Sequence, residues 1–113
     1  MSESCLFCRI ANGEIASNKV HEDEDIIAFE DINPQAPSHL LVIPRKHIPT
    51  VNDLQEVDEP LVGKMHRVAS KLMQARNHTG WRSVINCNAE AGQTVFHLHL
   101  HALGGRPLNW PPG

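Results

Sequence analysis

Histidine alternates with apolar residues near the end of the chain, in the stretch VFHLHLHAL at residues 95–103. Strict alternation is typical of a β-strand, whose successive side chains point to opposite faces. We therefore predict that His97, His99 and His101 share one face, about 7 Å apart because a strand rises ~3.3 Å per residue. The apolar residues between them would face the core. Three imidazoles on one face are unusual for a half-exposed strand, and they indicate a site that binds a ligand or catalyses a reaction.

Two kinds of chemistry fit these histidines. Imidazole is the commonest zinc ligand, so the three residues could bind a metal. One imidazole could instead attack phosphorus or carbon while the others orient it. The flanking turn NAEAGQT at residues 88–94 favours the second reading, because backbone amides in a turn of small residues can face an anion. Asn86 and a fourth histidine, His39, could help to orient the reacting groups.

The cysteines raise a separate question. Of the three cysteines, Cys5 and Cys8 have the spacing C-x-x-C. The N-terminus has no basic segment followed by an apolar one, so we expect no secretory signal and a cytoplasmic protein. In that compartment a C-x-x-C pair indicates a metal or redox site rather than a structural disulfide. Cys87 falls in a predicted strand and is expected to pack beside the core.

Composition limits the classes of function. The chain has 113 residues, which suits one domain covering residues 1–113, and its net charge is −3 with no dense block of Lys and Arg. These features argue against a partner that is a nucleic-acid polymer, although a single nucleotide remains a possible ligand. No apolar run approaches the ~20 residues needed to span a bilayer, so we expect no membrane partner.

The pattern of apolar residues predicts an α+β domain. We expect an antiparallel sheet of about five strands, one long central helix and a short N-terminal helix. The long helix would run from Glu59 to about Asn77, with Pro60 in its first turn and Asp58 as its N-cap. The predicted helical turn covers residues 5–12, and the predicted strands lie within residues 19–32, 39–44, 81–88 and 95–103.

The stretch HLHLHAL at residues 97–103 has the form His-φ-His-φ-His-φ-φ, where φ is apolar. This pattern resembles the signature of the histidine-triad family. The segments AFEDINPQAPSHLLVIPRKHI, residues 28–48, and GQTVFHLHLHALGGRPLNWPPG, residues 92–113, are similar to the branch of purine nucleoside phosphoramidases. The likeness covers nearly the whole chain, from Cys5 to Gly113.

The resemblance implies a covalent mechanism. His99 would attack the α-phosphorus of a purine nucleoside phosphoramidate or acyl-nucleotide, a derivative of AMP or GMP, and water would then release the nucleoside monophosphate. The main-chain carbonyl of His97 would orient His99, while His101 would contact the phosphoryl oxygens or the leaving group. His39 would lie beside the triad. No cofactor would be needed for catalysis.

The resemblance also implies substrate contacts. Asp31 would accept both ribose hydroxyls, which suits an acceptor-only carboxylate. Phe29 and Ile32 would line the base pocket. The expected phosphate-side residues are Asn86, Gly92, Gln93, Thr94 and Val95.

Two further implications concern a metal and a partner. Some bacterial members pair a C-x-x-C with the histidine of P-x-x-H and the first triad histidine, which implies a closed structural zinc site made by Cys5, Cys8, His47 and His97. The branch forms homodimers, and the tail at residues 106–113, with Trp110, would reach the partner's active site.

Two alternatives stay open. Other branches of the family imply a dinucleoside polyphosphate hydrolase. A module that binds nucleotides for regulation, with little turnover, would use the same residues without the chemistry.

Overall fold

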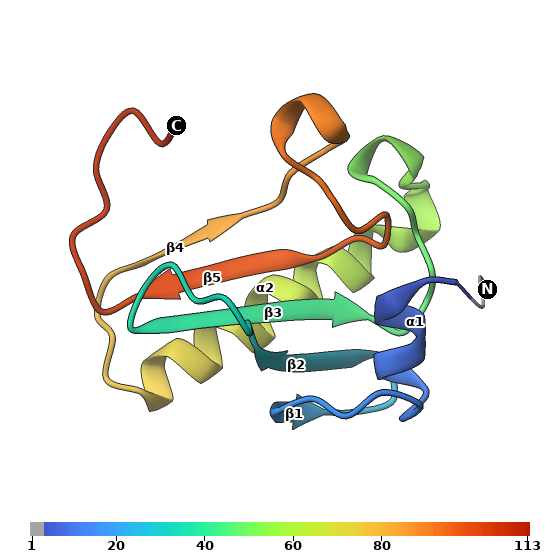
Figure 1. The fold of residues 1–113 in the computed structure, drawn as a ribbon, viewed down its shortest axis with the longest axis horizontal. Helices are drawn as coiled ribbons and strands as arrows, with labels where there is room; N and C mark the ends of the chain where they lie inside the picture. Colours follow the sequence, from blue (N-terminus) through green and yellow to red (C-terminus); the bar gives the residue numbers. More distant parts are fainter. Residues whose placement is uncertain (1–3) are drawn as a thin grey trace.

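The computed structural model describes residues 4–113. Within these residues, five antiparallel strands form one sheet in the order β1-β2-β3-β5-β4 (Figure 1). Their bounds are Lys19–Glu22 for β1, Ile26–Glu30 for β2, Ser38–Pro44 for β3, Trp81–Val84 for β4 and Leu100–Gly104 for β5. With the long helix α2 and the short helix α1, this architecture confirms the predicted α+β class.

Helix α2, Glu59–Ala75, covers one face of the sheet (Figure 1). Its apolar stripe faces the sheet: Met65, Val68, Ala69 and Met73 are buried against alternate residues of β2, β3 and β5. Asp58 does precede the helix, but its carboxylate accepts hydrogen bonds from the Gln55 amide and the Lys46 ammonium instead of capping α2.

Helix α1, Leu6–Ala11, packs on the opposite face of the sheet. Its buried residues contact the other set of alternate strand residues, including Ile27 and Phe29 of β2. A six-residue helix is too short to be stable alone, so it depends on this packing. Because both faces are covered, β3 is buried along its whole length and reads as a continuous apolar run.

The histidine strand is shorter than predicted. Regular pairing begins only at Leu100, and residues 95–99 are irregular. Pro44, next to this segment, has no amide proton to donate, and its carbonyl oxygen accepts from the His97 ring. The Leu98 amide donates to the oxygen of Ile48 instead, at 2.6 Å. Hence only His101 lies in the strand, and the prediction of a strand across 95–103 is wrong at its start.

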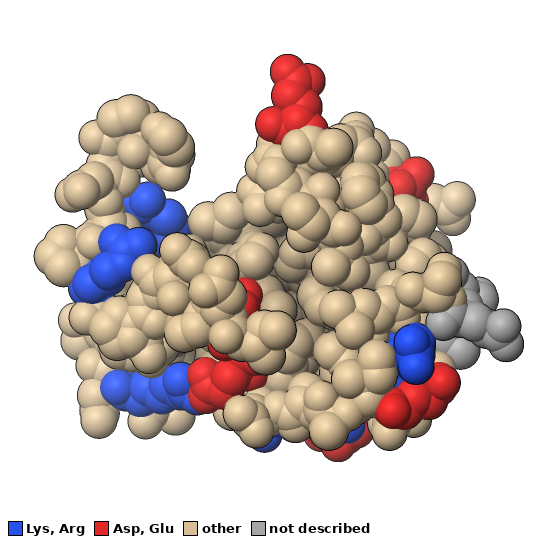
Figure 2. Space-filling view, in the orientation of Figure 1, with Lys and Arg blue, Asp and Glu red and all other residues tan. Residues whose placement is uncertain are grey.

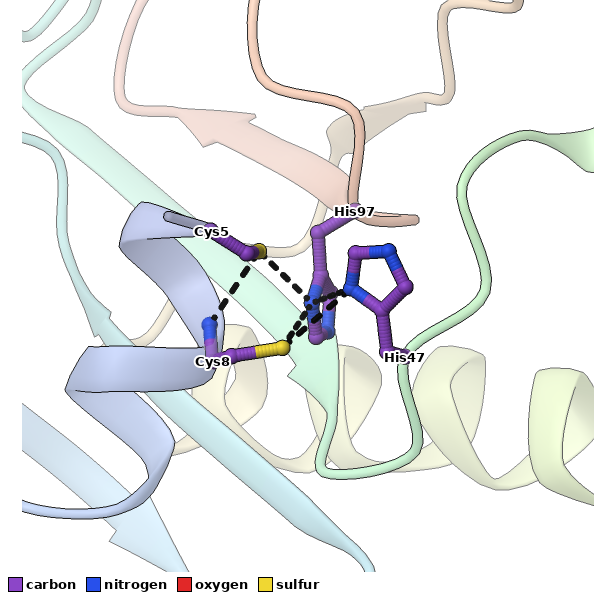
Figure 3. A group of neighbouring side chains, drawn as sticks. All are labelled: Cys5, Cys8, His47 and His97. Carbon is purple, nitrogen blue, oxygen red and sulfur yellow. Dashed lines mark hydrogen bonds between the residues drawn. The ribbon is translucent and has the colours of Figure 1, made fainter. Parts of the chain in front are cut away.

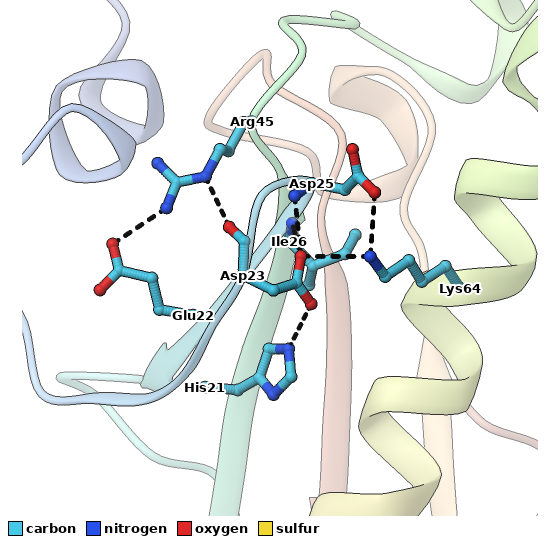
Figure 4. A network of polar contacts seen from close by, with 7 residues as sticks. All are labelled: His21, Glu22, Asp23, Asp25, Ile26, Arg45 and Lys64. Carbon is cyan, nitrogen blue, oxygen red and sulfur yellow. Dashed lines mark hydrogen bonds and ion pairs between the residues drawn. The ribbon is translucent and has the colours of Figure 1, made fainter.

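The turn between β1 and β2 is tied to both helices through polar contacts, and Figure 4 shows those that involve Lys64 of α2. Asp23 accepts hydrogen bonds from the Lys64 ammonium of α2 and lies 2.6 Å from the His21 ring. Burial raises the pKa of the Asp23 carboxyl, but its hydrogen bonds outweigh burial and hold that pKa well below the ordinary 3.8. Arg45 donates to the oxygens of Asp23 and of Ala11, so it joins the turn to the end of α1.

The C-terminal tail leaves the sheet at the end of β5 (Figure 1). The Arg82 guanidinium of β4 donates to the oxygens of Leu108 and Asn109, at 3.2 and 2.9 Å. Trp110 is 83% exposed.

Charged side chains lie mostly toward the margins of the face in Figure 2, whose centre is largely uncharged. Within residues 4–113, none of the helices has both the length and the apolar character required to cross a bilayer.

Candidate active site

His97, the first histidine of the triad, is fully buried. Its Nε2 lies 2.7 Å from the carbonyl oxygen of Pro44. A carbonyl can only accept, so Nε2 carries the proton and Nδ1 keeps its lone pair. Burial is the main cause that lowers the pKa of His97 to about 4, although the hydrogen bond to Pro44 opposes this. The ring is therefore neutral near pH 7.

The Nδ1 atom of His97 faces both cysteines and a second histidine (Figure 3). It lies 3.4 Å from the sulfur of Cys5, 3.4 Å from that of Cys8 and 3.2 Å from Nδ1 of His47. The four donor atoms are all within 4.8 Å of one another. Two sulfurs and two imidazole nitrogens are ligands that zinc prefers. The structure thus brings together all four predicted metal ligands.

His99 is also buried, and its ring is oriented by its own chain. Its Nδ1 lies 2.8 Å from the main-chain oxygen of His97. Because that oxygen only accepts, Nδ1 carries the proton and Nε2 keeps a free lone pair. Burial lowers the pKa of His99, which further favours the neutral ring, while the hydrogen bond to His97 opposes the shift. A neutral imidazole with one free nitrogen is a competent nucleophile.

His39 and His101 form a hydrogen-bonded chain. The Gln35 amide donates to Nδ1 of His39 at 3.0 Å, so His39 carries its proton on Nε2. That nitrogen lies 2.9 Å from Nδ1 of His101 and 3.4 Å from the Asp31 carboxylate. His101 therefore accepts at Nδ1 and keeps its proton on Nε2, ready to donate. Because Nε2 of His39 carries a proton, it has no lone pair with which to bind a cation. These side chains therefore form a chain of hydrogen bonds.

Burial lowers the pKa values of both residues in this chain. For His101 burial is the main cause, the neighbouring His99 and His39 add to it, and the pKa falls to about 4. For His39 burial lowers the pKa and the Asp31 carboxylate partly restores it. Both rings are therefore neutral near pH 7, and the proton positions follow from the hydrogen bonds.

Comparison with known proteins identifies the family. A family model described as "Scavenger mRNA decapping enzyme C-term binding" matches residues 4–107. The chain is 44% identical to the purine nucleoside phosphoramidase of Escherichia coli K12 over 110 residues, which cover 96% of this chain and 92% of that protein. The chain belongs to the histidine-triad family. The predicted family is thus confirmed.

Solved structures of the histidine-triad family share the fold. The crystal structure of a HIT family hydrolase from Legionella pneumophila Philadelphia 1 matches with a TM-score of 0.94 at 53% identity, covering 97% of this chain and 100% of that one. A histidine triad protein from Clostridium difficile matches with a TM-score of 0.93 at 42% identity, covering 96% of each chain.

The residues expected to bind the nucleoside differ in their exposure. Asp31 accepts from the Asn33 amide at 2.8 Å and retains capacity for further hydrogen bonds. Phe29 is buried, with its ring 5.6 Å from that of Phe7. Ile32 is fully exposed. Of these residues, Asp31 and Phe29 are already held in place, whereas the Ile32 side chain projects into solvent.

The turn before the triad is held by Gln93. Its side-chain nitrogen Nε2 donates to the backbone oxygens of Pro49 and Val95, at 2.8 and 3.1 Å. Its side-chain oxygen Oε1 accepts from the backbone amide of Asn88 at 2.7 Å. The side chain is therefore used within the protein. Gly92 has φ +97°, a conformation that favours glycine.

Other predicted residues on the phosphate side have different surroundings. Val95 is half-buried and Thr94 is exposed, and both line a cavity of about 430 Å³ that also reaches Cys5 and His47. Asn86 is half-buried just beyond β4. Trp110 lies in the exposed tail. The rings of His99 and His101 contact each other, and their further ring contacts are to Phe7 and His39 rather than to Trp110.

Two contributors were missed from the sequence. The carbonyl of Pro44 sets the proton position of His97, and the ring of Phe7 lies 5.0 Å from that of His99. A backbone carbonyl gives no signal in side-chain identities. Phe7 could have been noticed, because it lies between Cys5 and Cys8.

Proposed function

We propose that this histidine-triad protein hydrolyses purine nucleoside 5′-phosphoramidates and acyl-nucleotides to the nucleoside monophosphate. The observation that carries the proposal is the hydrogen bond from Nδ1 of His99 to the oxygen of His97, which leaves Nε2 free to attack. The 44% identity to the Escherichia coli purine nucleoside phosphoramidase supports the substrate class.

The reaction proceeds in two displacements at phosphorus. Nε2 of His99 forms a bond to the α-phosphorus while the bond from phosphorus to the leaving nitrogen breaks. The amine departs with the electron pair and takes up a proton from solvent. His101 donates its Nε2–H to a phosphoryl oxygen or to the leaving nitrogen, which stabilises the charge that develops there.

Water completes the cycle. It attacks phosphorus, the bond from phosphorus to Nε2 breaks, and the electron pair returns to His99. The two protons that water loses pass to solvent, and the nucleoside monophosphate leaves. The Gln35 amide and His39 keep the proton of His101 on Nε2 through both steps.

The rest of the chain binds and orients the substrate. Asp31 accepts the ribose hydroxyls, and Phe29 and Ile32 line the base pocket. Backbone amides and side chains of the turn face the phosphate, with Gln93 holding the turn in shape through its own hydrogen bonds. The remaining phosphate-side residues are Asn86, Gly92, Thr94 and Val95.

The cysteine–histidine cluster binds a structural zinc ion. Cys5, Cys8, His47 and His97 provide the ligands, and zinc links the N-terminal turn to the segment behind the nucleophile. The hydrogen bond from His97 to Pro44 supports this role, because it turns the lone pair of the ring toward the two sulfurs. Zinc supplies rigidity here, and catalysis itself uses no cofactor.

The single domain of residues 1–113 acts as a homodimer. Strand β4 lies at the edge of the sheet, and an edge strand can pair with a second copy. The tail at residues 106–113 presents the exposed ring of Trp110, which would contact the active site of the partner.

The decisive experiment measures turnover of adenosine 5′-phosphoramidate and traps the adduct. Wild-type protein should release AMP. When the reaction is quenched without acid, mass spectrometry should find the nucleotidyl group on His99. His99→Ala should lose turnover by roughly 10⁴-fold or more. The matched control His66→Ala changes an exposed histidine on α2 and should remain active.

Near wild-type turnover by His99→Ala would end the assignment of the nucleophile. Faster turnover of diadenosine polyphosphate than of the phosphoramidate would instead favour the polyphosphate hydrolase. Tight nucleotide binding without turnover of either substrate would favour a regulatory module.

A further inference from the structure

Phe7 joins the cysteine pair to the nucleophile. It lies in α1 between Cys5 and Cys8, and its side chain is only 4% exposed. Its ring centroid lies 5.0 Å from that of His99, with 87° between the ring planes. Perpendicular ring pairs at this distance attract one another electrostatically, in addition to the effect of their buried area.

The hydrogen bond to His97 leaves one motion of the His99 ring uncontrolled. It holds the ring at Nδ1, whereas the attacking atom, Nε2, lies across the ring. A single anchored atom permits the ring to tilt, and a tilt moves Nε2 away from the line of attack. A firm contact with the face or edge of the ring opposes that tilt.

We propose that Phe7 is a positioning residue that holds the His99 ring in its attacking orientation, an inference that rests on the proposed function. The ring of His101 contacts His99 at the same centroid distance, 5.0 Å, but it also has to donate to the substrate. Phe7 has no polar group, so its contact with His99 can remain unchanged throughout the reaction.

Both ends of α1 are restrained, which allows Phe7 to act as a fixed support. At its start, the Cys5 sulfur accepts from the Cys8 amide at 3.3 Å, and both sulfurs lie 3.4 Å from Nδ1 of His97. At its end, Arg45 donates to the oxygen of Ala11 at 2.8 Å. The ring of Phe7 also packs edge-on against that of Phe29, at 5.6 Å.

The test replaces Phe7 with Leu, which keeps an apolar side chain but removes the ring. A displacement of 1 Å can cost about 100-fold in rate, and for a partial loss of support we expect kcat on adenosine 5′-phosphoramidate to fall about tenfold. The Nδ1–H signal of His99 in ¹⁵N-edited NMR should weaken or vanish, because a mobile ring exchanges this proton with water. Zinc content should not change. Leu6→Ala alters the exposed neighbour on the same turn and should keep both the kcat and the signal of the wild type.

Two results would overturn the proposal. If kcat stays within twofold while KM rises, Phe7 acts on substrate binding alone. If the His99 signal is as strong in Phe7→Leu as in the wild type, the ring does not need this support. The NMR result stands even if the wild-type protein fails to turn over phosphoramidates, so failure of the proposed function would be recognised separately. Should Phe7→Leu fail to fold, Phe7→Met provides the same comparison.

Discussion

The ring of His99 donates its Nδ1–H to the main-chain oxygen of His97 across 2.8 Å, and the ring of His97 in turn donates to Pro44 across 2.7 Å. The backbone of this histidine therefore orients the proposed nucleophile, while its side chain faces the sulfur pair. One residue thus contributes both to the orientation of His99 and to the cysteine–histidine cluster. Each of the following predictions tests one part of this arrangement.

Asp31→Asn should reduce the preference of the enzyme for a ribose substrate over its 2′-deoxy analogue. Hydrogen bonds to a charged group contribute about 1.5–3 kcal/mol, so we expect kcat/KM for adenosine 5′-phosphoramidate to fall roughly 10- to 100-fold. The 2′-deoxy substrate, which lacks one of the hydroxyls, should be affected less. Steady-state kinetics with both substrates measures this difference. Glu24→Gln, a change at an exposed acidic residue, is the control, and equal losses for both substrates would contradict the prediction.

Zinc removal should destabilise the fold. Metal analysis should find one zinc per chain, and a chelator should lower Tm by roughly 15 °C, as expected for a chain of this length when a bound ligand contributes about 4 kcal/mol. Cys8→Ser should lose the zinc. Cys87→Ser, at the cysteine outside the cluster, should retain it. An identical Tm with and without chelator would argue against a structural metal.

Stability should fall in mild acid because of His101. Its pKa is lowered to about 4 in the folded protein, chiefly by burial, against an ordinary value of 6.5. Between these values the unfolded chain binds more protons, so the free energy of unfolding falls as pH drops from 6.5 toward 4 and is level above 6.5. Urea unfolding at pH 7 and pH 5 should show a loss to which His101 contributes roughly 1–2 kcal/mol.

His101→Asn should remove this contribution and so reduce the difference in the free energy of unfolding between pH 7 and pH 5. His66→Asn, at an exposed histidine, should keep the wild-type difference. The assignment to His101 would fail if both variants followed the wild-type curve.

The tail should influence the choice of leaving group from across a dimer. Sedimentation should give a dimer mass, and Trp110→Ala should lower kcat/KM about tenfold for phosphoramidates with aromatic amines, because a stacked ring contributes about 0.5–1.5 kcal/mol. The unsubstituted phosphoramidate should change little. Val57→Ala removes another exposed apolar side chain and serves as the control. A strictly monomeric mass at micromolar concentration would contradict the prediction.

Local patterns in the sequence predicted most of the fold. The apolar stripe of α2 follows from the helical spacing of its apolar residues, and the buried strand β3 follows from its continuous apolar run. The alternation at 95–103 failed at its start because the partners of this segment are distant. Pro44 and Ile48, about fifty residues earlier, determine where its hydrogen bonds go.

The candidate site was predictable as a set of residues but not as a set of contacts. The cysteine spacing and the family likeness identified the four residues of the cysteine–histidine cluster, which the structure brings together. The same likeness gave no indication that the Gln93 side chain would bond to Pro49, because that contact joins residues 44 positions apart. Proton positions also required the structure, since they follow from which neighbours can only accept and which can only donate.

His97 uses its two ring nitrogens and its carbonyl oxygen in three different contacts. This affects how genetic data at the position are read. In a saturation scan, every substitution should score poorly, yet the score would not distinguish loss of metal from loss of rate, because the side chain is removed in each case. Replacing the amide of Leu98 by an ester would weaken the His97 carbonyl as an acceptor and leave the imidazole intact, although it would also remove the Leu98 N–H that donates to the Ile48 oxygen. Backbone chemistry can thus address the carbonyl of this residue separately from its ring, which side-chain replacement cannot do.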